Sequence, residues 1–315
     1  MIYTMQFTYP YLSLPIQLFP DLSACARIAV LCIYVIYDFK QGKTMSNSMS
    51  NSAHQNKLTA HYAKGAAEAL SALSRKRSRV HCITSTVAQD ISSDVILAVG
   101  AGSCFTLGVE EITELVSVTN TLVVNIGTLD NNRKAAIRPA IQAANDYSKP
   151  WILDPVSVHA SKKRCAYAME LLQHRPHVIR ANAMEIKALA GSSSPMAAQE
   201  LALQQGCVVA QTGETDIVTN GVKTIMIANG HEMQTRISAM GCATTAFMAC
   251  FMAVDHDAFD AAVQALLTMG VAAELAANKS LGPGSMHMNL LDSLYSINEQ
   301  TLARYGHVLE LERSN

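Results

Sequence analysis

Two acidic residues in the middle of the chain could hold a divalent cation. Asp154 ends an apolar run and precedes a proline, and Glu185 follows Asn182 by three residues at the start of a predicted helix. Mg²⁺ needs only one or two protein carboxylates when phosphate and water complete its shell. Asp154 could equally cap a turn, and the spacing of Asn182 and Glu185 is also that of a helix capping box. A magnesium site and a structural role therefore both remain open for this pair.

A second chemical signal is the stretch 238–245, SAMGCATT, in which Gly241 and Cys242 precede an Ala-rich helical pattern. A glycine at the start of a helix lets backbone N–H groups approach an anion, and the helix dipole favours negative charge there. Such donors could stabilise a phosphoryl group in transfer, whose charge is spread over three oxygens. A helix N-terminus lowers the pKa of a thiol, so we expect Cys242 to be unusually acidic. The alternative is a small residue packed at a tight turn.

These residues must be positioned by an alternating pattern of strands and helices between residues 58 and 307. The predicted strands are residues 95–99, 121–126, 150–153, 178–180, 208–211 and 224–227. The predicted helices are residues 63–73, 138–147, 195–205, 244–254 and 261–278. Uniformly apolar strands alternating with helices are typical of βαβ units. We therefore expect an α/β fold with three layers, in which a mainly parallel central sheet lies between helices.

Polar residues follow several of the predicted strands. They occur at residues 125–128, 154–155, 180–182 and 212–214. Because ligands of a parallel α/β sheet bind outside the carboxyl ends of its strands, we expect one polar site at that edge.

Composition excludes several other classes of protein. The 315 residues carry 24 Lys and Arg against 25 Asp and Glu, with one Trp, so the basic stripe of a nucleic-acid binder is not expected. The eight cysteines form no CxxC pair and have no zinc-ligand spacing. Free cysteines in apolar stretches are typical of a reduced, cytoplasmic protein.

The first 52 residues differ in character from the rest, and we expect them to be an extension outside a single domain at residues 53–315. The apolar run 28–37 is shorter than the roughly 20 residues of a membrane span, so no stable membrane association is expected. A weak membrane anchor is the alternative. We favour a natural translation start at Met45 or Met49, which leaves the polar run 46–57 as a disordered N-terminus.

From about residue 58 onwards the chain resembles the hydroxyethylthiazole kinase family of the ribokinase-like superfamily. The stretches that carry the resemblance occur in the family's order. They are VHCIT (80–84), LAVGA (97–101), LVVNIGTL (122–129), ILDPV (152–156), IRANAMEI (179–186), TGETD (212–216), NGH (229–231), MGC (240–242) and GPGS (282–285).

The resemblance implies a ribokinase-like fold and a homotrimer with thiazole sites between subunits. It also implies ATP- and Mg²⁺-dependent phosphorylation of the hydroxyl of 4-methyl-5-(2-hydroxyethyl)thiazole, a salvage step in thiamine biosynthesis. Arg180 and Thr212 match residues of the family that bind ATP. Asp154 and Glu185 match the acidic residues that serve magnesium and phosphate.

The resemblance further assigns residues to the acceptor. Gly241 matches a glycine that contacts the substrate in the anion hole, and Cys242 stands where many ribokinase relatives place an aspartate base. In the thiazole pocket Ser85 replaces the family's usual asparagine, and Phe105 stands at a methionine position. Two departures, Ala181 and Ala239, replace glycines. We expect their methyl groups to narrow the approach to phosphate.

Three functions follow from these features. The first is phosphorylation of hydroxyethylthiazole. A kinase of another small hydroxyalkyl heterocycle is the second, because Ser85 and Phe105 alter the acceptor pocket. The third is a non-catalytic binder of thiazole or nucleotide. The last is less favoured because Asp154, Glu185, Arg180 and Cys242 are all retained, and a site that has lost its function is expected to lose its charges first.

Overall fold

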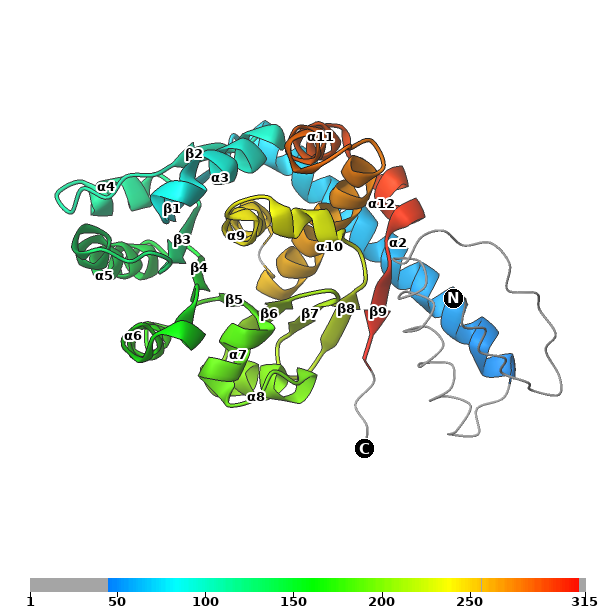
Figure 1. Cartoon of the computed structure of the whole chain (residues 1–315), viewed down its shortest axis with the longest axis horizontal. Helices are drawn as coiled ribbons and strands as arrows, with labels where there is room; N and C mark the ends of the chain where they lie inside the picture. The colour runs from blue at the N-terminus through cyan, green and yellow to red at the C-terminus, as the bar shows by residue number, and fades with distance from the viewer. Residues whose placement is uncertain (1–44, 256, 312–315) are drawn as a thin grey trace, which may run out of the picture. The chain divides into compact units, whose positions relative to one another are not determined.

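The computed structural model describes residues 45–255 and 257–311 (Figure 1). The chain divides between residues 53 and 54 into two units, and the second contains all the contacts discussed below. The expectation of a single domain at residues 53–315 stays a prediction. The polar run 46–57, expected to be disordered, lies within helix α2 (Met45–Lys76) and contains no proline or glycine that would interrupt it. The apolar run 28–37, and with it the membrane-anchor alternative, lies outside the described residues.

The described residues form one sheet in the order β2-β1-β3-β4-β5-β6-β7-β8-β9. Six neighbouring strands run parallel: β2 (Gly102–Cys104), β1 (Arg79–Ile83), β3 (Thr121–Asn125), β4 (Trp151–Asp154), β5 (Val178–Asn182) and β6 (Val208–Thr212). Three strands at one edge are antiparallel: β7 (Asp216–Thr219), β8 (Thr224–Ile227) and β9 (Val308–Glu310). The prediction of a mainly parallel sheet is confirmed.

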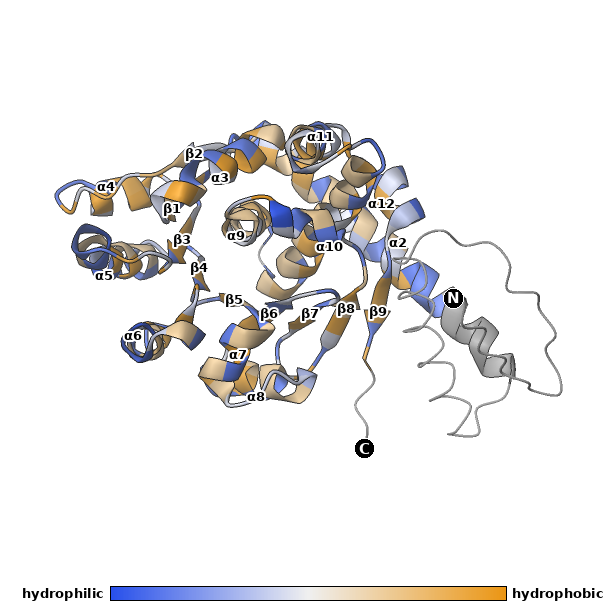
Figure 2. Ribbon diagram, in the orientation of Figure 1, coloured by the Kyte–Doolittle hydropathy of each residue, from blue (hydrophilic) through white to orange (hydrophobic). Residues whose placement is uncertain are grey.

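Alternate residues of the central strands face opposite sides of the sheet. Val123 pairs with Ile152, and both belong to one buried cluster, whereas the next pair, Val124 and Leu153, belongs to the other. All four side chains are at most 1% exposed. Burial on both faces explains why the middle residues of these strands are apolar, and Figure 2 shows hydrophobic colour in the sheet.

Helices cover both faces of the sheet (Figure 1), so the three-layer prediction is also confirmed. One face packs against α2, α3 (Thr86–Ala98), α9 (Met240–Met252), α10 (Ala258–Ala277), α11 (Pro283–Ser296) and α12 (Glu299–Tyr305). The other packs against α4 (Ile112–Ser117), α5 (Asn131–Asp146), α6 (Lys162–Leu172), α7 (Ala183–Ala190) and α8 (Pro195–Gln205). Two short 3₁₀ turns, Val158–Ala160 and Glu232–Arg236, lie in the connections.

One predicted strand, residues 95–99, is wrong. These residues form the end of α3 and the turn after it. The buried residues of α3 include Ala88, Ile91 and Val95, which are spaced three or four apart as on one face of a helix. A short apolar run does not by itself show whether the segment is a buried helix or a buried strand. The edge of the parallel sheet is made instead by β1 and β2.

Helix α10 is long and apolar enough to cross a membrane by length and composition alone. However, 78% of its most apolar window is buried inside the protein. Its side chains contribute to the core beneath α9 and α11, which is the environment of a helix at the centre of a globular domain.

Candidate active site

Asp154 lies at the carboxyl end of β4, in the middle of the sheet, and is fully buried. Its Oδ2 atom accepts hydrogen bonds from Asn125 Nδ2 at 2.7 Å and from Thr245 Oγ1 at 2.8 Å. Its Oδ1 atom is buried and has no hydrogen-bond partner among the described residues. Two neighbours therefore fix one oxygen of this carboxylate and leave the other for a ligand.

The electrostatic surroundings of Asp154 favour a positively charged or proton-donating ligand. Burial raises the pKa of its carboxyl group to about 7, and the negative charge of Glu185 adds to the increase. The charge of Arg180 and the bonds from Thr245 and Asn125 act in the opposite direction. A buried carboxylate that lacks a partner on one oxygen is costly, and a hard cation would satisfy it.

Glu185 is buried and has a clear structural role. It is the third residue of α7 and forms a capping box, in which Asn182 N donates to Oε2 and Glu185 N donates to the side chain of Asn182. Its Oε1 atom accepts a bond from Ser157 N at 2.8 Å, which holds the left-handed residue Ser157 in the loop after β4. The capping alternative is thus observed. The predicted magnesium role of Glu185 stays a prediction.

Arg180, on β5, lies against the first turn of α9. A Cβ atom added to Gly241 would lie 2.9 Å from Arg180 Nη1 and 3.3 Å from Nη2, so a larger residue would make this guanidinium shift. The charge of Arg180 lowers the pKa of Asp154 and of Cys242. Because a cation is unfavourable at a helix N-terminus, this arrangement places two positive features where a shared anion would stabilise both.

Cys242 lies in the first turn of α9, and the prediction of a lowered thiol pKa is wrong. Burial, with the negative charge of Asp154 beside it, raises the pKa of Cys242 to about 12. A hydrogen bond from Asn125 and the charge of Arg180 oppose this increase without overcoming it. The favourable effect of a helix end is modest and is outweighed by the loss of water around the thiolate.

The two alanines that replace family glycines differ in position. Ala181 is fully buried in the core on the side of α4 to α8, so the expected narrowing of the phosphate approach is wrong for this residue. Ala239 precedes α9 with φ of 57°, in the left-handed region. That conformation costs an L-residue about 1 kcal/mol relative to glycine. The departure at Ala239 therefore adds strain directly beside Gly241.

The remaining predicted site residues lie on either side of Asp154. Thr212 ends β6 and is in register with Asn182 on β5. Ser85 follows β1 and Phe105 follows β2. In the strand order, β1 and β2 lie on the other side of β4 from β6. All are at the carboxyl edge of the parallel strands, but no hydrogen bond recorded for the described residues joins Ser85 or Phe105 to Asp154, Arg180 or Cys242.

Three polar residues of the site were not predicted from the sequence. Asn125 donates a hydrogen bond to Asp154 and accepts one from Gly127 N. Thr245 links α9 to β4 through its hydrogen bond to Asp154. The third, Asp216, accepts a bond from Gly213 N at 3.0 Å and has its pKa raised to about 7 by burial. Asn125 belongs to the polar stretch 125–128, and Asp216 to the family-like stretch TGETD (212–216), so each had a signal in the sequence.

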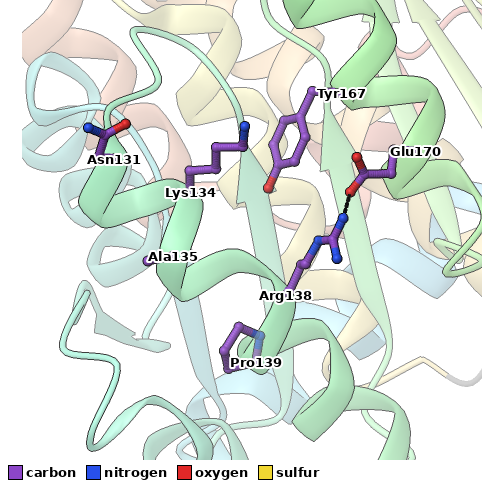
Figure 3. A pocket seen from close by; sticks show the side chains of 7 residues that line it. All are labelled: Asn131, Lys134, Ala135, Arg138, Pro139, Tyr167 and Glu170. Atoms are coloured by element: carbon purple, nitrogen blue, oxygen red, sulfur yellow. Dashed lines mark hydrogen bonds and ion pairs between the residues drawn. The ribbon is translucent and has the colours of Figure 1, made fainter.

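A surface hollow of about 540 Å³ lies elsewhere, between α5 and α6 (Figure 3). Lys134 lies 5.0 Å from the ring centre of Tyr167, and Arg138 forms an ion pair with Glu170. These contacts join the two helices. None of the predicted site residues lines the hollow, so the candidate active site is the edge around Asp154.

No group of three or more His, Cys, Asp or Glu side chains arranged to bind a metal occurs within the described residues. This agrees with the donor set around Asp154, which offers at most two carboxylates. A protein-only cage for zinc or calcium would need more ligands than are present here, whereas Mg²⁺ would take the remainder from phosphate and water.

Comparison with known proteins identifies the family. Residues 70–300 match the model of the hydroxyethylthiazole kinase family. A hydroxyethylthiazole kinase of Granulibacter bethesdensis is 41% identical, over 74% of this chain and 90% of that protein, and one of Pectobacterium carotovorum is 37% identical, over 76% and 97%.

Solved structures agree with this assignment. The structure of a hydroxyethylthiazole kinase protein from Pyrococcus horikoshii OT3 has a TM-score of 0.76 and 35% identity, covering 79% of this chain and all of that one. A ribokinase-like superfamily protein of Enterococcus faecalis, at 13% identity and a TM-score of 0.58, shares the fold. The chain is a kinase that belongs to the hydroxyethylthiazole kinase family.

Proposed function

We propose that this protein transfers the γ-phosphoryl group of ATP to the hydroxyl of 4-methyl-5-(2-hydroxyethyl)thiazole, a step of thiamine biosynthesis. The observation that carries the proposal is the meeting of Asp154, Arg180 and the first turn of α9 at one strand edge. The membership of this chain in the hydroxyethylthiazole kinase family supports the choice of acceptor.

Arg180 and Thr212 are the proposed ATP-binding residues. Arg180 lies on Gly241, so its guanidinium and the amides at the start of α9 can face the same phosphate oxygens. Donors that are already in place before the reaction stabilise the charge of the transferring phosphoryl group without reorganisation. Positioning of this kind supplies most of the catalysis in phosphoryl transfer.

Asp154 and Glu185 are the proposed residues for Mg²⁺. The buried Oδ1 atom of Asp154, which lacks a protein partner, is a hard oxygen donor and fits a hard cation. Both oxygens of Glu185 already accept backbone N–H groups, so its contribution would come through a bound water. When bound, Mg²⁺ neutralises phosphate charge during the transfer.

Cys242 is proposed to orient the acceptor hydroxyl rather than to remove its proton. With its pKa raised to about 12, the thiol is protonated at neutral pH and cannot act as a ready base. A loose transition state makes little demand on base strength, because the hydroxyl loses its proton late. Ser85 and Phe105 would form the acceptor pocket beside it, and Gly241 would contact both the acceptor and Arg180.

We also propose that the protein acts as a homotrimer in the cytoplasm. The trimer rests on the family resemblance, and sedimentation equilibrium would test it. The cytoplasmic location agrees with the cysteines in the described part of the chain, which are all free, as expected in a reducing compartment.

A coupled ADP-release assay tests the proposed function. We expect ADP formation from ATP only when both hydroxyethylthiazole and Mg²⁺ are present, with one thiazole phosphate formed per ADP by mass spectrometry. Absence of thiazole phosphate at saturating substrates would contradict the proposal.

A second candidate function is phosphorylation of another small hydroxyalkyl heterocycle. It is favoured by Ser85, which stands where the family usually has an asparagine and would change the polarity of the acceptor side. Hydroxymethylpyrimidines and sugar alcohols assayed beside hydroxyethylthiazole would identify the preferred acceptor by kcat/KM. A non-catalytic binder would instead show thermal stabilisation by thiazole or ATP and no ADP from any acceptor.

A further inference from the structure

Asp216 occupies a special place in the hairpin that joins β6 to β7. The backbone pairing of these strands ends at Gln211 and Ile217. One residue further on, the side chain of Asp216 continues the closure, because its Oδ1 atom accepts a hydrogen bond from Gly213 N at 3.0 Å. A side chain therefore fixes the loop where the strand ladder stops.

The loop itself offers little else to hold Gly213. This glycine is exposed, and a Cβ atom placed on it would contact only Thr215 O, at 3.7 Å. Glycine has more backbone freedom than any other residue, so an unrestrained Gly213 would lose much entropy on meeting a ligand. The bond to Asp216 removes part of that freedom beforehand, and ordering before binding raises affinity.

The surroundings of Asp216 connect it to the phosphate side of the site. The charge of Arg180 lowers the pKa of Asp216 and that of Asp154, so the guanidinium interacts with a carboxylate from β4 and with another from β7. The effect of burial outweighs that of the Arg180 charge and raises the pKa of Asp216 to about 7. A shielded carboxylate is costly unless it accepts hydrogen bonds, and the Gly213 amide provides one.

We propose that Asp216 is a positioning residue for the nucleotide, which holds Gly213 and so keeps the adjacent Thr212 in its ATP-binding place. The inference rests on the proposed function, in which Thr212 and Arg180 contact ATP. Asp216 acts through its acceptor oxygen, and a neutral side chain with the same oxygen can replace it.

Three variants test this role. Asp216→Ala removes the acceptor, Asp216→Asn keeps it without the charge, and Glu214→Gln removes a charge from an exposed position of the same loop. The readouts are the Kd for the non-hydrolysable analogue AMP-PCP with Mg²⁺ by calorimetry, and the separate KM values for ATP and the acceptor.

We expect Asp216→Ala to raise the Kd for AMP-PCP and the KM for ATP by up to about tenfold, the scale of losing one hydrogen bond. The KM for the acceptor should not change. Asp216→Asn should stay within about twofold of the wild type, and Glu214→Gln should match it. A purely structural role would lower the melting temperature without this selective loss of nucleotide affinity.

Unchanged affinity of the Ala variant for AMP-PCP would overturn the inference. So would an Asn variant as weak as the Ala variant, because the hydrogen bond would then not be the cause. The proposed function fails separately: a wild-type protein that binds AMP-PCP but does not phosphorylate hydroxyethylthiazole refutes the acceptor assignment and leaves the Asp216 measurements valid.

Discussion

The two sides of the candidate site are built differently. On the side of β4 to β7, two carboxylates accept hydrogen bonds from neighbouring donors: Asp154 from Asn125 and Thr245, and Asp216 from Gly213. On the side of β1 and β2, Ser85 makes no capping bond, and Phe105 is partly buried against the core.

This difference corresponds to the demands of the two proposed ligands. A triphosphate carries several charges, and fixed donors and carboxylates must be arranged around it before it binds. A small heterocycle is recognised mainly by the shape and polarity of a pocket, where a change of one side chain alters affinity modestly. We therefore expect variants on the first side to affect turnover or ATP, and variants on the second to affect only the acceptor.

Asp154→Asn is expected to have the largest effect. The Asn side chain can direct its oxygen toward Asn125 and Thr245, so the fold should be kept, while the charge on the other oxygen is lost. We expect kcat to fall about 10²- to 10³-fold, as when a preorganised electrostatic group is removed. ADP release under saturating substrates measures it. Thr245→Val is the matched control, since it removes one support of Asp154 and keeps the charge; an equal loss in both variants would argue against a special role for the charge.

Cys242→Ala should lower kcat about tenfold and leave the affinity for ATP nearly unchanged. The thiol is protonated at neutral pH, so the loss reflects orientation of the acceptor hydroxyl rather than removal of a base. Single-turnover rates together with the Kd for AMP-PCP would separate the two quantities. Turnover equal to that of the wild type would remove Cys242 from the mechanism.

Gly241→Ala asks which ligand this glycine serves. The new methyl group would lie 2.9 Å from Arg180 Nη1 and displace the guanidinium. We expect the KM for ATP to rise about fivefold, with a smaller change for the acceptor. Gly284→Ala, at an exposed position of α11 where a Cβ meets no atom within 4 Å, is the control. A change confined to the acceptor KM would support the substrate contact that the family resemblance implies and not the packing on Arg180.

Ser85→Asn and Phe105→Met restore the family's usual residues on the acceptor side. We expect each to change the KM for hydroxyethylthiazole by about two- to fivefold, the scale of a modest change in a small pocket, without affecting the KM for ATP. Steady-state kinetics with each substrate varied in turn would measure this. An effect on ATP as large as that on the acceptor would remove the distinction between the two sides.

Much of the fold could be predicted from the sequence because helix and strand periodicities are local. Residues 195–205 were predicted to be a helix and form α8 with the same limits. The failure at residues 95–99 arose because a buried helix and a buried strand are both uniformly apolar over five residues.

The site was predictable only in part, for a physical reason. Asp154 and Arg180 could be found because they lie at or near strand ends, where a parallel sheet collects its ligands. The contact of Thr245 with Asp154 could not be found, since the two residues lie 91 positions apart in the chain and meet only in the folded protein. The prediction of a lowered pKa for Cys242 was wrong for the same reason: the burial of the thiol depends on segments that are distant in the chain.

A further expected effect is on stability, and it also distinguishes the two sides. Burial raises the pKa of Asp154 from 3.8 to about 7, so the folded protein binds more protons than the unfolded chain between these values. The free energy of unfolding contributed by this group therefore falls as pH rises through that range and stays low above it.

His81, whose pKa is lowered by burial, acts in the opposite direction, so the informative quantity is the difference between variant and wild type. We expect the melting temperature of Asp154→Asn, relative to the wild type, to increase by roughly 5 °C between pH 5 and pH 8. Ser85→Asn should show no such trend, and a constant difference for Asp154→Asn across this range would mean that its carboxyl group titrates normally in the folded protein.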